Sequence, residues 1–292
     1  MSRDSSVLKK LSFVRLLVIC SVWWTIPNPV LAQALLPHTL QLDTAKLEKQ
    51  GLSLAQEAAS LAQFQQYELA LPRARLAVQL APNNDRVWFL LGSIHMQTKD
   101  FTNALSALQR AQTLNPKNHQ VQFALGSLHF QQEKYQTALT YYQAGLRLQP
   151  NDANGLFDLG NTYYMLNRYQ DAIAQYRKSI AQNAKFWPAI NNIGLVLYEQ
   201  GDIQGAIKKW QESIAIDKRA AEPMLALAVA NYIKGDRQQS IVMGEQALKI
   251  DARYGDLDFL KQNLWGQKLL GHAKQFLSLP RIQAALEAGN RQ

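Results

Sequence analysis

Residues 85–118 read DRVWFLLGSIHMQTKDFTNALSALQRAQTLNPKN and carry two helical patterns in one short stretch. Apolar residues recur at three- and four-residue steps in both halves of it, which predicts two amphipathic helices. Lys99 and Asp100 separate the halves, and so short a gap allows only the turn of an antiparallel hairpin. Asn115-Pro116 ends the second helix, because proline lacks an N–H and disfavours helical geometry in the residue before it.

Four ladders of residues repeat along the chain with a step of 34 residues. They mark a leucine and the following glycine on the first helix of each unit, an alanine on the second helix, and a proline beyond it. Their members are Leu91, Leu125, Leu159 and Ile193; Gly92, Gly126, Gly160 and Gly194; Ala70, Ala104, Ala138, Ala172 and Ala206; and Pro82, Pro116 and Pro150. A 34-residue period with two helices per unit predicts a stack of helical hairpins, since no single hairpin can bury its apolar face alone.

This pattern resembles that of the tetratricopeptide repeat (TPR) family. The residues that match the family pattern are Trp88, Leu91, Gly92, Ala104, Leu108 and Pro116. The resemblance implies an all-α fold, a right-handed superhelical solenoid of TPR helix-turn-helix repeats with a C-terminal capping helix. Close approach of the two helices at their crossing requires small residues, and Gly92 and Ala104 fill those places.

Composition and repeat boundaries divide the chain into four expected segments. These are residues 1–34, a signal peptide or membrane anchor; residues 35–50, a connector; residues 51–254, the TPR array; and residues 255–292, the C-terminal capping helices. The array is expected to hold about six repeats, at residues 51–84, 85–118, 119–152, 153–186, 187–220 and 221–254. The first repeat is degenerate, as is usual at the end of a solenoid.

The first 34 residues have the pattern of an export signal. Basic residues precede an apolar run at Leu16–Ile26, and Ala32 and Ala34 fit the small-x-small rule of signal peptidase. The run is shorter than the roughly 20 residues that span a bilayer, which favours cleavage. Neighbouring apolar residues could lengthen it, so an uncleaved anchor stays open. We expect an exported or membrane-associated protein, in the periplasm, the plasma membrane or the thylakoid.

The charge of the chain points away from nucleic acid. The chain has 31 basic and 22 acidic residues, a formal net charge of +9. The basic residues are scattered in short pairs such as Lys208-Lys209, which is typical of a solvated helix surface. Cys20 is the single cysteine and lies in the expected leader. The remainder of the chain therefore has no disulfide, thiol nucleophile or cysteine metal site.

Nothing in the sequence points to catalysis. His95 and His129 occupy equivalent places in successive repeats, where other repeats have Tyr163 and Leu197, so a packing role is expected. Facing helices of such a stack lie about 10 Å apart, too far for two imidazoles to share a metal ion readily. The chain has no metalloprotease, phosphate-loop or nucleophile-elbow motif. We expect no enzyme activity, no catalytic residue, no cofactor and no metal.

A narrower resemblance rests on the leader and on the tail segment FLKQNLWG at residues 259–266. Both are similar to a group of cyanobacterial membrane-associated TPR assembly factors, which includes the protochlorophyllide oxidoreductase-interacting TPR protein. The resemblance implies a non-catalytic scaffold or assembly factor in thylakoid, photosynthetic-protein or chlorophyll biogenesis. The alternative is an accessory or docking subunit of an envelope enzyme system that handles cell wall or polysaccharide.

The first helices of TPR hairpins line the concave side of the stack, so we expect the protein-binding residues there. Two ladders of mostly aromatic residues and two asparagines meet this description. They are Phe89, Met96, Phe123, Phe130, Phe157, Asn161, Tyr164, Asn192, Tyr198 and Tyr232. We expect a protein partner that inserts an apolar or aromatic peptide segment or helix into this groove. The alternative is that these aromatic residues only pack against neighbouring helices.

The two asparagines are similar to part of the carboxylate clamp of chaperone-binding TPRs. The basic residues of that clamp are missing, because Phe157, Glu222 and Ala226 stand at their places. Recognition of an acidic carboxyl-terminal tail is therefore not expected. If the leader is retained, the membrane is a second partner, reached through residues 1–34.

Overall fold

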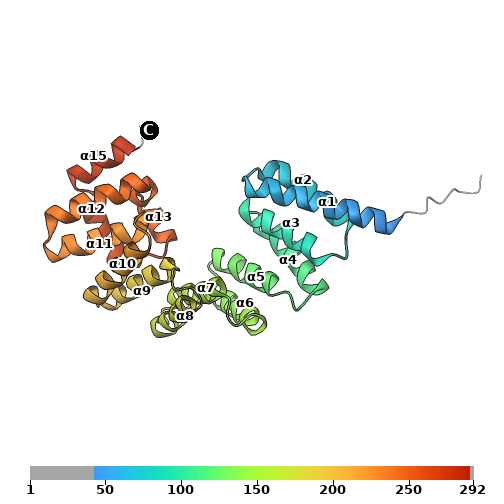
Figure 1. The fold of residues 1–292 in the computed structure, drawn as a ribbon, viewed down its shortest axis with the longest axis horizontal. Helices are drawn as coiled ribbons and strands as arrows, with labels where there is room; N and C mark the ends of the chain where they lie inside the picture. Colours follow the sequence, from blue (N-terminus) through green and yellow to red (C-terminus); the bar gives the residue numbers. More distant parts are fainter. Residues whose placement is uncertain (1–42, 290–292) are drawn as a thin grey trace, which may run out of the picture. The chain divides into compact units, whose positions relative to one another are not determined.

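The computed structural model describes residues 43–289 of the 292-residue chain. The predicted leader and residues 35–42 of the predicted connector lie outside the described residues, so these two segments stay predictions. Between Asp43 and Gly289 every regular element is a helix and none is a strand (Figure 1). The predicted all-α fold is confirmed.

Twelve of the helices in the described part form six consecutive hairpins (Figure 1). The pairs are α1 Thr44–Gln63 with α2 Tyr67–Leu80; α3 Asp85–Gln97 with α4 Phe101–Leu114; α5 His119–Gln131 with α6 Tyr135–Leu148; α7 Ala153–Met165 with α8 Tyr169–Gln182; α9 Trp187–Gln200 with α10 Ile203–Ile216; and α11 Ala221–Lys234 with α12 Arg237–Ile250. Each second helix also packs against the first helix of the next hairpin, which makes the stack continuous. The predicted solenoid is confirmed.

The first hairpin begins earlier than the sequence patterns suggested. Helix α1 starts at Thr44, inside the segment 35–50 that was expected to be a connector. The reason is local: the Asp43 side chain accepts a hydrogen bond from the Lys46 backbone N–H at 3.0 Å and caps the helix. An aspartate at this position satisfies one of the N–H groups that a helix start leaves unpaired.

Small residues lie at the helix crossings, as the ladders predicted. A Cβ added to Gly160 would lie 2.5 Å from the Tyr176 ring, and one added to Gly194 would lie 2.5 Å from Trp210. The alanines of the 34-residue ladder on the second helices, including Ala104 and Ala138, are fully buried. A larger side chain at any of these places would force the two helices of its hairpin apart.

The hairpin turns repeat one backbone conformation. Each turn has a residue with positive φ at the same place: Gln65, Lys99, Glu133, Asn167, Gly201 and Gly235. Residues other than glycine are sterically strained in this left-handed region. The first four turns have a non-glycine residue there and are strained, whereas the last two have glycine and are not.

The C-terminal segment packs in two places. It consists of η1 Ala252–Gly255, α13 Leu257–Gln262, α14 Gln267–Leu277 and α15 Pro280–Gly289. Helix α15 packs against α12 at the end of the stack, which confirms the predicted capping helix. Helix α14 packs instead against α9 and α11, the first helices of the last two hairpins. The segment predicted to cap the stack therefore also lies on the first-helix side.

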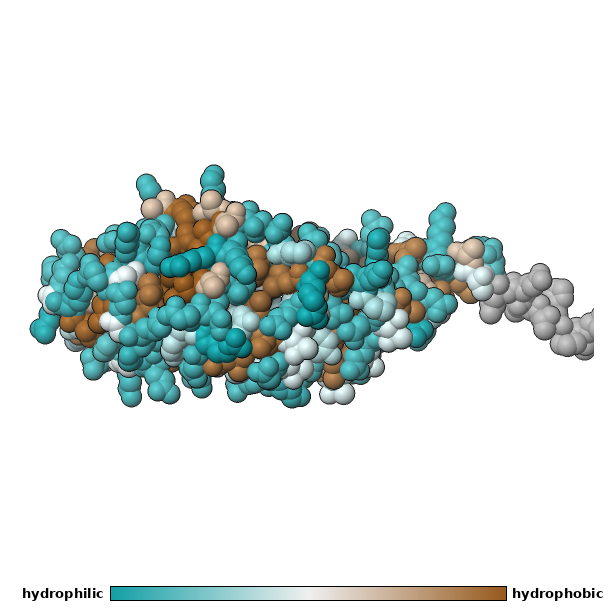
Figure 2. Space-filling model, turned by 90° about the horizontal axis from the view of Figure 1, so that it is seen from below, coloured by the Kyte–Doolittle hydropathy of each residue, from teal (hydrophilic) through white to brown (hydrophobic). Residues whose placement is uncertain are grey.

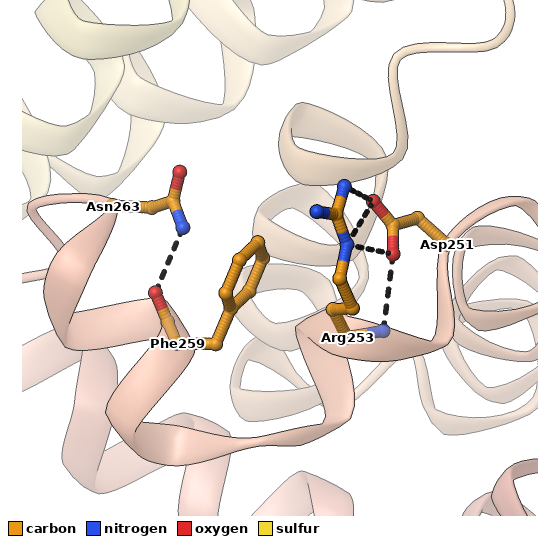
Figure 3. Close-up of polar contacts among 4 residues, drawn as sticks. All are labelled: Asp251, Arg253, Phe259 and Asn263. Atoms are coloured by element: carbon orange, nitrogen blue, oxygen red, sulfur yellow. Dashed lines mark hydrogen bonds and ion pairs between the residues drawn. The ribbon is translucent and has the colours of Figure 1, made fainter. Parts of the chain in front are cut away.

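A polar and aromatic cluster fixes the turn that directs this segment (Figure 3). Arg253 Nη2 lies 2.7 Å from Asp251 Oδ2, and the guanidinium lies 5.0 Å from the centre of the Phe259 ring. Asn263 Nδ2 donates to the Phe259 carbonyl oxygen at 2.8 Å, which holds the end of α13. These contacts set the direction in which the chain leaves α12.

Candidate functional site

Helices α3, α5, α7, α9 and α11 follow one another on one side of the stack, and we call this side the first-helix face. It is the side on which the sequence predicted partner binding. On the side of the molecule drawn in Figure 2, hydrophilic residues predominate and apolar residues are exposed in several patches, most densely in the left part of the view, so hydropathy alone does not single out one site there. The contacts of individual side chains separate the face into two halves.

The half made by α9 and α11 is covered by the chain's own α14 and by the turn between α13 and α14. Trp265, between these two helices, is only 3% exposed, and its Nε1 donates to Glu222 Oε1 at 3.1 Å. The carboxylate of Glu199 accepts from the backbone N–H groups of Lys268 at 3.2 Å and Leu269 at 3.0 Å. A carboxylate at this place caps the start of α14 and complements its helix dipole. We call this the filled half.

Aromatic residues of the first helices complete the contact with α14. The Tyr198 hydroxyl lies 2.6 Å from His272 Nδ1, and the two rings meet edge-on. Tyr232 meets Phe276 edge-on with ring centres 5.4 Å apart. Tyr198 and Tyr232 were predicted to bind a partner, and in the structure they bind the chain's own tail.

A buried polar network continues from the filled half toward α7. Asn192 Nδ2 donates to Asn161 Oδ1 at 2.9 Å, and the Tyr176 hydroxyl donates to the same oxygen at 2.8 Å. Asn191 Nδ2 donates to Asn192 Oδ1 at 3.1 Å. The two asparagines that the sequence offered for a peptide backbone therefore bond to each other here.

Glu222 is the acid at the end of this network. Burial raises the pKa of its carboxyl to about 7, although hydrogen bonds from Trp265 and Asn191 oppose the shift. The carboxyl is only weakly ionised below neutral pH for that reason. The sequence showed Glu222 only as an acid at the place of a missing clamp cation, whereas the structure makes it the acceptor for the tail tryptophan.

The half made by α3, α5 and α7 contains a hollow that the described residues leave uncovered. Apolar and polar side chains from all three helices line it, and we call it the open hollow. Its lining consists of Phe89, Ser93, Met96, Gln97, His119, Gln120, Phe123, Ala124, Ser127, Asp152, Asn154 and Asp158. Phe89, Met96 and Phe123, which the sequence predicted as binding residues, come together here.

Asp158 is the unusual member of the lining. Burial, and then the nearby charge of Asp152, raise the pKa of its carboxyl to about 7. The side chain keeps some accessible surface because it faces the hollow. Within residues 43–289, no hydrogen bond or ion pair is made by its carboxylate. A desolvated acid without a partner is costly, so this site is poised for a positively charged or donor group.

Phe123 has a second role besides lining the hollow. Its ring lies against Gly145 of α6 and Gly155 of α7, so closely that a Cβ on either glycine would clash with it. The ring thus wedges between the second helix of its own hairpin and the first helix of the next. The packing alternative considered for the aromatic ladders applies to this residue.

Three other predicted binding residues lie on α5 and α7 but outside the open hollow. Phe130 meets Tyr135 with ring centres 5.2 Å apart, and Phe157 meets Phe186 at 5.3 Å. Tyr164 is buried and lines a second recess, beside the tail. These residues are not part of the open hollow, so the structure does not gather all ten predicted residues at one place.

Sequence reasoning missed the acids of the open hollow. Asp158 holds the place that Ala124 and Asn192 hold in neighbouring repeats, and Asp152 precedes it at the start of α7. A charged residue at a place that other repeats give to uncharged side chains was the available signal. The search for ladders selects residues that recur from repeat to repeat. An acid that occurs at this place in one repeat only is therefore overlooked.

The buried histidines have a packing environment. His95 and His129 are nearly inaccessible, and burial lowers the pKa of both imidazoles. His129 stacks on Tyr141 with ring centres 5.3 Å apart. Across residues 43–289, no group of three or more His, Cys, Asp or Glu side chains is placed to hold a metal ion. None of the helices in that range is both long and apolar enough to cross a bilayer.

Two protein families match parts of the chain. Residues 38–182 match the family described as cytochrome c-type biogenesis protein H TPR domain, and residues 194–235 match a TPR repeat family. Among curated proteins, none matches this sequence. From residue 43 on, both family matches lie on the described hairpins, and they support the repeat assignment for most of the stack.

Solved structures with the same fold are similar to this chain over much of its length. PilF of Pseudomonas aeruginosa has 16% identity and a TM-score of 0.62, and the match covers 75% of this chain and 99% of that one. MamA from Desulfovibrio magneticus has 16% identity and a TM-score of 0.53, with 60% and 96% covered. A thermophilic TPR protein of Thermus thermophilus has 14% identity and a TM-score of 0.53, with 62% and 99% covered. At these identities the likeness concerns the fold.

Proposed function

Because the chain is a tetratricopeptide repeat protein, we propose that it is a non-catalytic scaffold that binds a segment of a partner protein on its first-helix face. The observation that carries the proposal is the difference between the halves of that face. One half holds a helix of the chain itself, and the other is left uncovered by the described residues.

The filled half shows that the first-helix face can hold a helix. Helix α14 brings Leu269, Ala273 and Phe276 onto α9 and α11, and all three are buried there. Burial of such side chains stabilises a contact by about 25 cal/mol for each Å² removed from water. The same repeat fold therefore holds an amphipathic helix on this face, in the helix-in-groove mode of peptide recognition.

The open half offers a comparable mixture of side chains. Phe89 and Met96 from α3 and Phe123 from α5 supply apolar surface, while Gln97, Gln120 and Asn154 supply polar groups at the rim. Interfaces commonly combine an apolar centre with a polar rim. The occupant we propose is an apolar or aromatic segment of another protein, either helical or extended.

We further infer a role as an assembly factor. The match of residues 38–182 to the TPR domain of cytochrome c-type biogenesis protein H supports this reading, because that protein's name refers to a biogenesis process. The leader pattern supports an exported or membrane-anchored location. Assembly of thylakoid or pigment-synthesis proteins is the specific role suggested by the tail segment, and docking of an envelope enzyme is the alternative.

Affinity purification of the tagged full-length chain from membranes tests the proposal. The wild type is compared with one variant that blocks the open hollow and with one control variant. Gln120→Trp places a large ring over the open hollow, at a side chain that is exposed. Gln109→Trp makes the same change on the second helix α4, at another exposed glutamine. Both variants should keep the wild-type melting point.

A partner of the open half should be recovered with the wild type and with Gln109→Trp and be lost with Gln120→Trp. Photosystem or pigment-synthesis proteins in that set favour the first role, and transferases or hydrolases favour the alternative. Equal recovery with all three proteins would overturn binding at the open half.

A further inference from the structure

The carboxylate of Asp158 has no cationic partner among the described residues. The side chain lines the open hollow from α7, and within residues 43–289 no lysine or arginine forms an ion pair with it. Asp152 is the nearest acid, but its Oδ1 accepts from the Gly155 backbone N–H at 2.6 Å and serves as a helix cap. The hollow therefore has acidic side chains on its α7 side.

The groups on the neighbouring second helices do not supply a positive charge either. Tyr142 of α6 and Tyr176 of α8 both lie close enough for the Asp158 charge to raise their pKa, in addition to the larger effect of burial. His119 of α5 lies on the rim and meets Phe123 edge-on with ring centres 5.9 Å apart. Asp158 thus has two tyrosines near it from the second helices, and its accessible side lies in the hollow.

We propose that the open hollow binds a lysine or arginine side chain of the partner segment, with an adjacent apolar residue of that segment against Phe89 and Met96. This inference rests on the proposed function and names the chemistry of its partner. The long aliphatic stem of either basic residue suits the path past Phe123, and its charged end reaches the carboxylate. An arginine could make two parallel hydrogen bonds to the carboxylate, which gives it the better geometry.

Other occupants fit this chemistry less well. A divalent cation would meet only two acids here, one of which already caps a helix, whereas such ions take six or more oxygen ligands. A nucleic-acid backbone would be repelled by the same acids. An acidic or uncharged peptide would leave the carboxylate desolvated and unpaired, which costs binding free energy.

Peptide selection against the full-length chain tests the inference without assuming a sequence. A phage library of random twelve-residue peptides is panned on the wild type, on Asp158→Asn and on Asp171→Asn. Asp171 is a half-exposed aspartate on the second helix α8, where it pairs with Arg168, and it serves as the control. Wild type and control should enrich peptides with arginine or lysine beside an apolar residue, and Asp158→Asn should not.

Synthetic versions of the enriched peptides then give the size of the effect. The dissociation constant of an arginine peptide should rise about tenfold to hundredfold in Asp158→Asn, the range expected for a hydrogen bond to a charged group. Replacing that arginine by leucine should weaken binding to the wild type but not to Asp158→Asn. The melting point of Asp158→Asn should not fall, because the substitution removes a desolvated charge.

Binding of the arginine peptide should also strengthen as the pH rises, because the Asp158 carboxyl becomes ionised. With a pKa of about 7, Asp158 becomes ionised as the pH rises, so affinity for the arginine peptide should increase between pH 6 and pH 8 by up to about tenfold. The other titratable groups that face it are Asp152, His119, Tyr142 and Tyr176. The rise should persist in His119→Gln and disappear in Asp158→Asn.

The outcomes separate this inference from the proposed function. Enriched peptides that lack basic residues, but compete with one another and are blocked by Gln120→Trp, would overturn the inference and leave groove binding intact. No enrichment on any of the three proteins, and none after the leader residues named below are changed, would overturn both. The basic leader residues Arg3, Lys9, Lys10 and Arg15 are the rival source of a cation. Binding that appears only after these four are changed to glutamine would assign the hollow to the leader and overturn the partner assignment.

Discussion

The two halves of the first-helix face each contain a desolvated acid, and the chain treats the two acids differently. Burial raises the pKa of Glu222 and of Asp158 to about 7 in both cases. In the filled half, Glu222 accepts a hydrogen bond from Trp265 of the tail. In the open half, no described residue donates to the Asp158 carboxylate. The tail supplies a hydrogen-bond donor to Glu222, and we propose that a partner supplies one to Asp158.

The first-helix face thus packs against the tail in one half and is left uncovered by the described residues in the other. The tail ends the array by covering apolar side chains of α9 and α11 that would otherwise face solvent. The chain supplies no such cover for α3, α5 and α7 within residues 43–289. A stack whose stability sums over neighbouring units tolerates an uncovered half, because each hairpin is held mainly by its sequence neighbours.

Removal of the tail tryptophan should have the largest effect. Trp265→Ala deletes a buried aromatic side chain and leaves Glu222 without its tryptophan donor, so it should lower the free energy of unfolding by about 3–5 kcal/mol. Denaturant titration measures the loss. Hydrogen exchange should localise it to α9, α11 and α14 and leave α3 and α5 unchanged.

Phe64→Ala is the matched control for this experiment, because Phe64 is 76% exposed. It should change the free energy of unfolding by less than about 0.5 kcal/mol. If Trp265→Ala is as mild as the control, the tail does not hold the filled half in the way described.

Glu222→Gln should remove a pH dependence from the filled half. The folded pKa of Glu222 is about 7, above its ordinary value of 4.5, so its contribution to stability is present below about pH 4.5 and is lost as the pH rises through 7. The span corresponds to about 3 kcal/mol. Glutamine keeps an acceptor for Trp265, so the variant should gain on the wild type by about that amount between pH 4.5 and pH 8. Equal pH profiles would contradict a buried, ionisable Glu222.

Phe123→Ala separates packing from binding in the open half. Its ring fills the space beside Gly145 and Gly155, and its truncation should cost about 1–3 kcal/mol of stability, less than for a fully buried ring. Thermal melts of Phe123→Ala and of the rim control Gln120→Ala measure this. An unchanged melting point for Phe123→Ala would return this residue to the purely binding role predicted from the ladders.

The hairpin turns give the smallest expected effect. Glu133 has φ 59°, whereas Gly201 at the equivalent place in the filled half has φ 91°. Glu133→Gly should raise the free energy of unfolding by about 0.5–1 kcal/mol, since relief of the left-handed strain exceeds the added flexibility of glycine. Gly201→Ala should lower it by a similar amount. The same sign for both substitutions would contradict the turn conformation.

The repeated part of this fold was predictable because its contacts are local. Gly92, Ala104 and their equivalents recur at a fixed step, and each packs within its own hairpin or the next. The place of α14 was not predictable in the same way. Trp265 and α14 bond to Glu222, Glu199 and Tyr198, which lie 43 to 74 residues away in sequence, and no repeat links them. The amphipathic pattern of the tail showed that it covers apolar surface without showing which surface.

The candidate site was predictable only in part for the same reason. The ladders led to Phe89, Met96 and Phe123, which line one hollow, but equally to Tyr198 and Tyr232, which the tail covers. A ladder assigns the same role to every repeat. The tail breaks that equivalence, so the repeats that remain open are known only from the structure.

Hydrogen exchange of the full-length chain with and without a selected arginine peptide tests the central claim most directly. If the open half is the binding site, amides of α3, α5 and α7 should exchange more slowly with peptide present, while those of α9, α11 and α14 stay unchanged. Faster exchange in α14 together with slower exchange in α9 and α11 would show that the peptide displaces the tail, and would contradict the division of the face into a filled and an open half.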